Sequence, residues 1–201
     1  MSFGKLKEEK MKRPHIVLLG GTLRPGSSTE RLLRLAGQKA EAAGARVSAF
    51  CGAAIDFPAY APERGAPCDA AAAMTAALAS ADGVIIGSPG YHGSVSGLVK
   101  NALDYIEGLR TDPRPYLDGR PVGCVVTAAG WQGAVGTLTA LRSIVHALRG
   151  WPTPLGIALN TASQGDGDPC ATLDVHRQIE TLVGQILNFN AAGKLVEVSA
   201  A

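Results

Sequence analysis

The sequence predicts an α/β domain built on a doubly wound, mostly parallel sheet with helices on both faces. Short apolar runs and stretches of helical periodicity alternate five times along the chain. The apolar runs are continuous, which is typical of strands that are covered on both faces. Repeated alternation of strand and helix requires right-handed crossovers between parallel strands, although it leaves the strand order open.

Each element follows from these patterns. The predicted strands are 15–20, 46–50, 83–87, 121–127 and 155–159. The predicted helices are 28–43, 69–81, 96–109, 134–148 and 174–189. Gly44 is the expected stop of the first helix. The segment 51–67 is rich in proline, glycine and alanine, which predicts a loop.

Composition narrows the domain organisation and the function classes. We expect a flexible polar leader over residues 1–13 and a single domain over residues 14–201, because no repeat or linker divides the chain. A net charge of +2 is too small to attract nucleic acid. The four cysteines lack metal-site spacing, and no stretch approaches the roughly 20 apolar residues of a membrane span. We therefore expect a cytoplasmic protein without a resident metal, a nucleic-acid partner or membrane association.

The turn after the first strand has the composition of a phosphate site. It resembles a nucleotide-binding P-loop, but serine stands where the essential lysine belongs, which argues against a nucleotide hydrolase. Backbone N–H groups and the helix dipole favour an anion at a helix N-terminus. The alternative is that Ser28 or Thr29 only caps the helix, which accounts for one hydroxyl. The candidate phosphate ligands are Thr22, Arg24, Ser27, Ser28 and Thr29.

A second turn follows the third strand, where ligands bind in open α/β sheets. Tyr91 and His92 offer flat side chains for a ring system, or else they are ordinary surface residues. No second histidine or cysteine stands at metal-ligand spacing from His92, and no nucleophile elbow occurs in the chain. The candidate residues of this turn are Pro89, Gly90, Tyr91, His92, Gly93 and Ser94.

A third turn follows the fourth strand and completes the predicted mouth. Its small residues allow the backbone to approach a ligand closely. Trp131 is expected either to stack as a lid or to contact another subunit, and residues 56–60 are expected to cover the pocket. The candidate residues of this turn are Thr127, Ala128, Ala129 and Gly130.

Two of these turns resemble motifs of the NAD(P)H-dependent FMN reductase family of flavodoxin-like proteins. Residues 21–29 resemble the phosphate motif G-S-x-R-x-x-S-x-N. Residues 89–105 resemble P-E-Y-N-x-S-x-P-G-x-L-K-N-A-x-D-W without a gap, and the resemblance extends over residues 14–189. It implies a five-stranded parallel sheet in the order 2-1-3-4-5. It also implies that the first turn holds the FMN phosphate, that residues 89–92 face the ring, and that the third turn lies at its pyrimidine edge.

The chain departs from the family motifs at several positions. Thr22 replaces serine and Thr29 replaces asparagine in the phosphate motif. Gly90 replaces glutamate and His92 replaces asparagine, which we interpret as a change in the surface where the acceptor docks. Ser96 replaces proline, a variant similar to flavin reductases that supply two-component monooxygenases.

The resemblance implies an enzyme in which FMN carries the chemistry and no side chain is catalytic. NADPH or NADH would reduce the flavin at N5, and a small-molecule acceptor would then be reduced in a ping-pong scheme. The acceptor is left open among flavin, quinone, azo and nitro compounds, and the family implies a homodimer or homotetramer. The alternative is a non-enzymatic flavodoxin-like electron carrier. Flavodoxins are usually strongly acidic, whereas this chain has a pI near 8.4.

Overall fold

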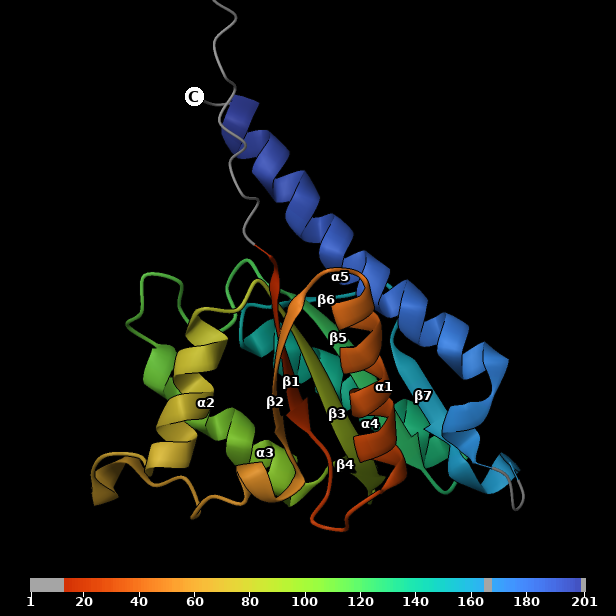
Figure 1. Ribbon diagram of the computed structural model, residues 1–201. Helices are drawn as coiled ribbons and strands as arrows, with labels where there is room; N and C mark the ends of the chain where they lie inside the picture. Colours follow the sequence, from red (N-terminus) through yellow and green to blue (C-terminus); the bar gives the residue numbers. More distant parts are fainter. Residues whose placement is uncertain (1–12, 165–167, 200–201) are drawn as a thin grey trace, which may run out of the picture.

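The computed structural model describes residues 13–164 and 168–199, so most of the predicted polar leader lies outside the described residues. Its centre is a parallel sheet in the order β2-β1-β3-β5, with β7 paired to the far side of β5 (Figure 1). In the numbering of the five predicted strands this order is 2-1-3-4-5, as expected. The strands are β1 His15–Gly20, β2 Arg46–Cys51, β3 Gly83–Tyr91, β5 Pro121–Ala128 and β7 Ile157–Asn160.

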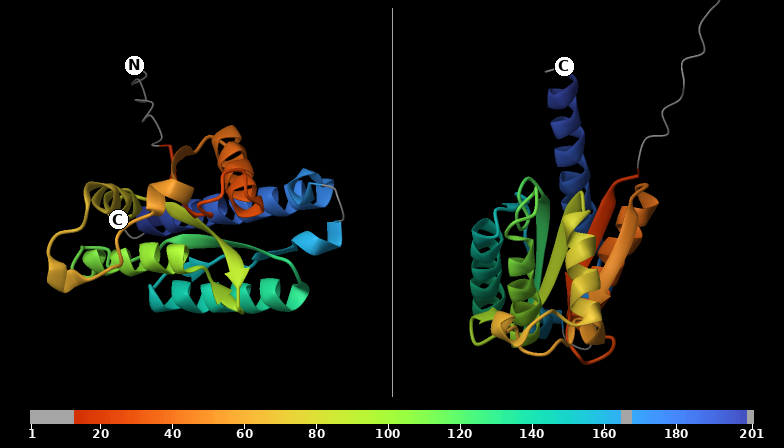
Figure 2. Two further views of the ribbon diagram at one scale, coloured as in Figure 1. Left: turned by 90° about the horizontal axis from the view of Figure 1, so that it is seen from below. Right: turned by 90° about the vertical axis from the view of Figure 1, so that its left-hand side faces the viewer.

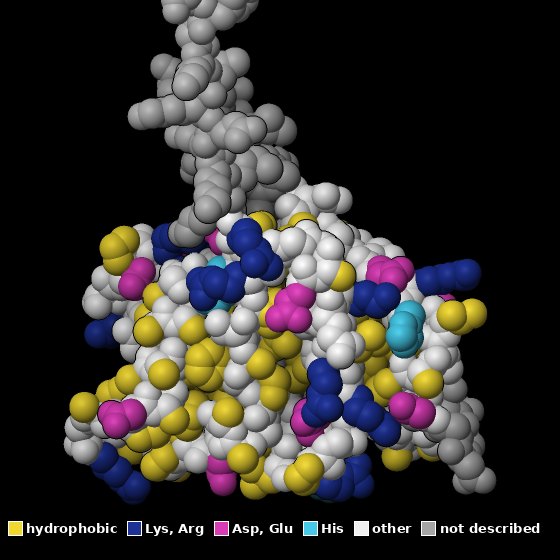
Figure 3. Space-filling model, viewed as in Figure 1, with side chains coloured by type: hydrophobic (Ala, Val, Ile, Leu, Met, Phe, Trp, Pro, Cys, Tyr) yellow, Lys and Arg dark blue, Asp and Glu magenta, His cyan; other side chains and the backbone are white. Residues whose placement is uncertain are grey.

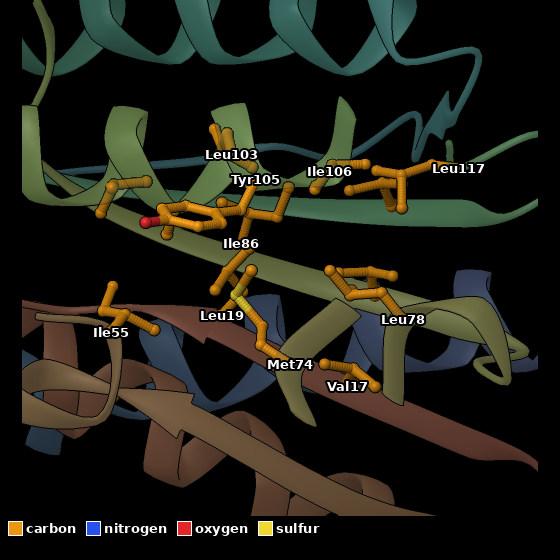
Figure 4. Close-up of a cluster of buried hydrophobic side chains, with 14 of the residues drawn as sticks. Val17, Leu19, Ile55, Met74, Leu78, Ile86, Leu103, Tyr105, Ile106 and Leu117 are labelled. Carbon is orange, nitrogen blue, oxygen red and sulfur yellow. The ribbon is translucent and has the colours of Figure 1, made fainter. Parts of the chain in front are cut away.

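Helices cover both faces of the sheet (Figure 2). One core cluster joins the sheet to α1 and α5, and the other joins it to α2, α3 and α4. Val17 and Leu19 of β1 enter the cluster shown in Figure 4. Ile16 and Leu18 enter the other cluster, because side chains alternate along a strand. The helices are α1 Ser28–Ala42, α2 Asp69–Ala79, α3 Gly97–Asp104, α4 Trp131–Ala147 and α5 Leu173–Ser199.

The third strand is longer than predicted. β3 continues to Tyr91 because a short strand, β4 Ser94–Val95, folds back and pairs with it. His92 and Gly93 form the turn with φ of 52° and 84°. Two successive positive φ angles define the hairpin turn whose twist matches antiparallel strands. The turn predicted after the third strand is therefore the tip of a hairpin.

Other boundaries differ from prediction for local reasons. The predicted helix 96–109 is α3 followed by a 3-10 helix, Tyr105–Leu109, and α4 begins at Trp131. The predicted loop 51–67 contains two 3-10 helices, Gly52–Ile55 and Pro62–Arg64. A further short strand, β6 Trp151–Pro152, pairs with β5 ahead of β7. These changes leave the crossovers and the strand order as predicted.

The open edge of the sheet is β2, whose side chains are half-buried or exposed. Hydrophobic side chains gather on this face between basic ones (Figure 3). The guanidinium of Arg13, a residue predicted to lie in the leader, donates to the carbonyls of Gly44 and Ala45 at 3.0 and 2.9 Å. Among the described helices, none is long and apolar enough to cross a membrane.

Candidate functional site

A cavity of about 570 Å³ lies at the carboxyl edge of the sheet, where β1, β3 and β5 end. This edge faces the viewer in the left panel of Figure 2. The volume of the cavity falls within the usual range for small-molecule and cofactor sites. The lining residues are Thr22, Leu23, Arg24, Ser27, Ser28, Thr29, Pro89, Gly90, Tyr91, Thr127, Ala128, Ala129 and Thr161.

Glycine brings the first two turns together. A Cβ on Gly20 would lie 1.8 Å from the carbonyl oxygen of Gly87, and the φ of Gly20 is +136°. Only glycine fits such a contact. The N–H of Gly21 then donates to the same carbonyl at 3.0 Å. The turn after β1 is thereby fixed against β3, and the cavity lies between the loops that follow.

The first turn presents hydroxyls at the N-terminus of α1. Ser27 is buried and caps the helix, because its Oγ accepts a hydrogen bond from the N–H of Glu30 at 3.3 Å. The cap is therefore Ser27, and neither Ser28 nor Thr29. The Glu30 carboxylate accepts from the N–H of Gly26 at 2.7 Å, which holds the turn.

Thr29 joins the first turn to the third. Its hydroxyl lies 2.7 Å from that of Thr127, and both side chains are buried. One of the two hydroxyls donates to the other, so this pair forms a fixed polar floor beneath the cavity. Thr29 is a lining residue as predicted, with part of its hydrogen-bonding capacity already used.

Arg24 gives the cavity its charge. Its side chain is exposed and makes no hydrogen bond or ion pair with the described residues. It is also the single charged side chain among the residues that line the cavity. A free guanidinium beside a helix N-terminus suits a phosphate, because charge-assisted hydrogen bonds are the strong ones.

The second turn contributes a rigid wall. The buried hydroxyl of Ser88 donates to the carbonyl of Pro89 at 2.8 Å and accepts from the N–H of Ser96 at 3.0 Å. Tyr91 stands at the end of this wall with 55% of its surface exposed. His92, Gly93 and Ser94, predicted to line the site, are exposed in the hairpin and do not line the cavity.

Gly90 lines the cavity through its backbone, and the structure changes the interpretation of this position. A Cβ there would lie 2.8 Å from Thr137 Oγ1 and 3.1 Å from the carbonyl oxygen of Gly133. A side chain at Gly90 would thus point into the first turns of α4. The loss of the family's glutamate allows α4 to pack on β3, and it does not reshape the cavity by removing a side chain from it.

The third turn is short. Ala128 and Ala129 line the cavity, whereas Gly130 is the N-cap of α4 and lies outside the lining. Trp131 is the first residue of α4 with 58% of its surface exposed, and it does not line the cavity either.

The segment 56–60 does not cover this cavity. The side chain of Asn101 accepts from the N–H of Tyr60 at 2.8 Å and donates to the carbonyl of Pro58 at 3.0 Å. The hydroxyl of Tyr105 donates to the same carbonyl at 3.0 Å. The second half of the 89–105 stretch therefore anchors the loop after β2 and takes no part in lining the cavity.

Two lining residues were not predicted. Thr161 follows β7, and its hydroxyl donates to the carbonyl of Ala128 at 3.2 Å. The same rule about strand ends that identified the other turns applies to it. Leu23 is an apolar residue within the hydroxyl-rich turn, with 55% of its surface exposed.

The cavity can bind a ligand, but its lining side chains offer little acid–base chemistry. No histidine, cysteine, aspartate, glutamate or lysine lines it, and no metal-binding group of side chains occurs among the described residues. One cation and several hydroxyls at a helix N-terminus fit a phosphate, and the small-residue backbone at the other end fits a flat ring. These features match the needs of a cofactor that brings its own chemistry, as FMN does.

The chain is similar in sequence or in fold to several proteins named as flavin-dependent oxidoreductases. An FMN-dependent NADPH-azoreductase of Staphylococcus haemolyticus is 39% identical over 79 residues, which cover 39% of this chain and 38% of that relative. The flavoenzyme NAD(P)H:(acceptor) oxidoreductase of Paracoccus denitrificans has a TM-score of 0.69 at 19% identity, over 88% of this chain and 98% of that one. An NADH:FMN oxidoreductase in its apo form has a TM-score of 0.65 at 22% identity, over 89% of each chain.

The structural likenesses, at these identities, concern the fold. The match to the azoreductase spans well under half of that protein. The family assignment rests on a longer match, because the model of the family described as NADPH-dependent FMN reductase covers residues 14–164. That range includes all three turns of the cavity and all five main strands in full. The chain belongs to the NADPH-dependent FMN reductase family.

Proposed function

We propose that this protein is an oxidoreductase that binds FMN in the cavity at the carboxyl edge and uses NADPH or NADH to reduce a small aromatic acceptor. The observation that carries the proposal is the polarity of the cavity. A cation and hydroxyls lie at one end, backbone of small residues lies at the other, and the lining lacks an acid–base pair. The family assignment and the FMN and NADPH in the azoreductase relative's name support the same cofactors.

The phosphate is assigned to the first turn. Arg24 would pair with it, and the N–H groups at the start of α1 would donate to its oxygens. Thr22, Ser27 and Ser28 line this end and offer hydroxyls. Thr29 would support the phosphate site mainly by holding the first turn to the third through its hydrogen bond with Thr127.

The ring system is assigned to the space between the turns after β3 and β5. Pro89 and Tyr91 would form one wall, and the backbone of Ala128 and Ala129 would lie at the other. N–H groups there would stabilise negative charge on the reduced ring. When bound, FMN supplies the chemistry by taking a hydride from the nicotinamide and returning two electrons to the acceptor.

Steady-state kinetics test the activity and its order. Oxidation of NADPH, followed at several fixed concentrations of free FMN, a quinone or an azo dye, should give parallel double-reciprocal lines. Parallel lines are expected because coenzyme and acceptor would use the same open face of the cavity in turn. Converging lines would contradict the ping-pong order. Tight FMN binding without NADPH oxidation would instead favour the electron carrier.

A further inference from the structure

Thr161 gives the ring end of the cavity a hydrogen-bond acceptor. A threonine hydroxyl has one hydrogen and two lone pairs. The hydrogen of Thr161 is already used, because its Oγ1 donates to the carbonyl of Ala128 at 3.2 Å. No group among the described residues donates to this oxygen, and the half-buried residue lines the cavity. While its bond to Ala128 is kept, this hydroxyl can meet a ligand only as an acceptor.

The other acceptors near the ring end have partners or have no fixed role. The carbonyl of Pro89 accepts from the hydroxyl of Ser88 at 2.8 Å, and the carbonyl of Ala128 accepts from Thr161. The hydroxyl of Thr127 lies 2.7 Å from that of Thr29, and either of the two can be the donor. Of the two threonines that line the cavity beside Ala128, Thr161 is therefore the one whose role as an acceptor is fixed.

The ring of FMN carries a matching donor. The pyrimidine edge of the isoalloxazine has a single N–H group, N3–H, between two carbonyl oxygens. A site that recognises this edge needs donors for the oxygens and one acceptor for N3–H. Backbone N–H groups of the turn after β5 are donors, and Thr161 Oγ1 is the acceptor beside that turn.

We propose that Thr161 Oγ1 accepts a hydrogen bond from N3–H of bound FMN and thereby determines which ring the cavity accepts. This inference rests on the proposed function, in which Ala128 and Ala129 lie beside the ring. A ring with a methyl group at this position loses the hydrogen bond, and a ring with a lone pair there faces the lone pairs of Thr161. A site that is built to pair with an N–H group rejects an analogue that lacks it.

Binding of 3-methyl-FMN tests the proposal without turnover. This analogue keeps the phosphate and replaces the N3 hydrogen with a methyl group. Both oxidised flavins are titrated by calorimetry in the absence of NADPH. Wild type should bind FMN at least about tenfold more tightly than 3-methyl-FMN, because the analogue cannot donate to Thr161.

Thr161→Val keeps the shape of the side chain and removes its hydroxyl. The preference for FMN over 3-methyl-FMN should shrink about tenfold in this variant and should be retained in Thr161→Ser, which keeps the hydroxyl. The ratio of the two affinities is the decisive quantity. If Thr161 did no more than hold the carbonyl of Ala128, its loss would weaken the binding of both flavins alike and leave the ratio unchanged.

Riboflavin separates the ring from the phosphate, and Thr181→Val is the matched control. Thr161→Val should weaken the binding of riboflavin and of FMN by the same factor, since the ring is common to both. Thr181 on α5 also donates its hydroxyl to a backbone carbonyl, that of Arg177 at 2.9 Å, but it does not line the cavity. The Thr181→Val protein should bind all three flavins as the wild type does.

Two results would overturn the inference. One is equal binding of FMN and 3-methyl-FMN by the wild type, and the other is an unchanged ratio of these affinities in Thr161→Val. In either case FMN still binds, so the proposed function stands. Wild type that binds none of the flavins would reject the proposed function itself, and this inference with it.

Discussion

Arg24 is the residue on which cofactor binding depends most. Hydrogen bonds to a charged group contribute about 1.5–3 kcal/mol, so Arg24→Ala should weaken FMN binding roughly 10- to 100-fold. Quenching of flavin fluorescence on titration measures this. Arg46→Ala is the control. Arg46 is exposed at the start of β2, so this substitution removes the same charge away from the lining of the cavity. Equal losses of FMN affinity in both variants would mean that only the overall charge of the protein affects binding.

Cys124 links stability to pH. Burial in β5 raises the pKa of this thiol from 9.0 to about 12. Between these values the unfolded chain loses its thiol proton while the folded chain keeps it, so stability falls as pH rises above 9. Cys124 alone should lower the free energy of unfolding by about 1.4 kcal/mol at about pH 10.

Urea unfolding at neutral pH and at about pH 10 tests this prediction, with Cys124→Ala as the comparison. The variant should lose less stability between the two pH values than the wild type. Higher pH should be avoided because of Arg120, whose pKa burial lowers to about 10. Above that pH the folded chain loses the Arg120 proton before the unfolded chain does, so Arg120 makes stability rise with pH and opposes the effect of Cys124. Identical pH dependence in both proteins would show that Cys124 titrates alike when folded and unfolded.

At the scale of elements, α4 depends on the glycine in the strand that it packs against. The Cβ of Gly90→Ala would overlap Thr137 Oγ1, which is already held by its hydrogen bond to the carbonyl of Ser94. Overpacking of this kind costs about 1–3 kcal/mol of stability. Displacement of α4 should also weaken FMN binding, since the turn before it lines the cavity.

Thermal unfolding and FMN titration of Gly90→Ala measure both effects. The control is Gly136→Ala in the interior of α4, where a Cβ would lie an ordinary 3.8 Å from the carbonyl oxygen of Gly93. That variant should be as stable as the wild type or slightly more stable, since alanine favours helix. A fully stable Gly90→Ala protein with normal FMN affinity would refute the packing role.

Elements and turns could be predicted from the sequence more reliably than contacts between them. Strand ends define where ligands bind, so the cavity was predicted at the turns after β1, β3 and β5. The pairing of Thr29 with Thr127 could not be predicted, because it depends on the register of residues 98 positions apart. The direction in which a side chain at Gly90 would point, and the hairpin that exposes His92, likewise depend on neighbouring elements that the local pattern does not specify.

At the scale of the whole molecule, we propose a homodimer or homotetramer. Trp131 and Val135 lie one turn apart on α4 with 58% and 53% of their surfaces exposed, beside the turn that lines the cavity. Light scattering should give a multiple of 20.6 kDa. Trp131→Glu should reduce the mass toward one chain, whereas Trp151→Glu, at an equally exposed tryptophan, should not. A single-chain mass for wild type at micromolar concentration would contradict the proposal.

The central claim is that the cavity recognises FMN through its phosphate at the start of α1. Titration of the wild-type protein with FMN and with riboflavin, which lacks the phosphate, tests it most directly. Two hydrogen bonds to a charged group predict that FMN binds at least about 100-fold more tightly. Equal affinities for the two flavins, or no binding of either, would contradict the account.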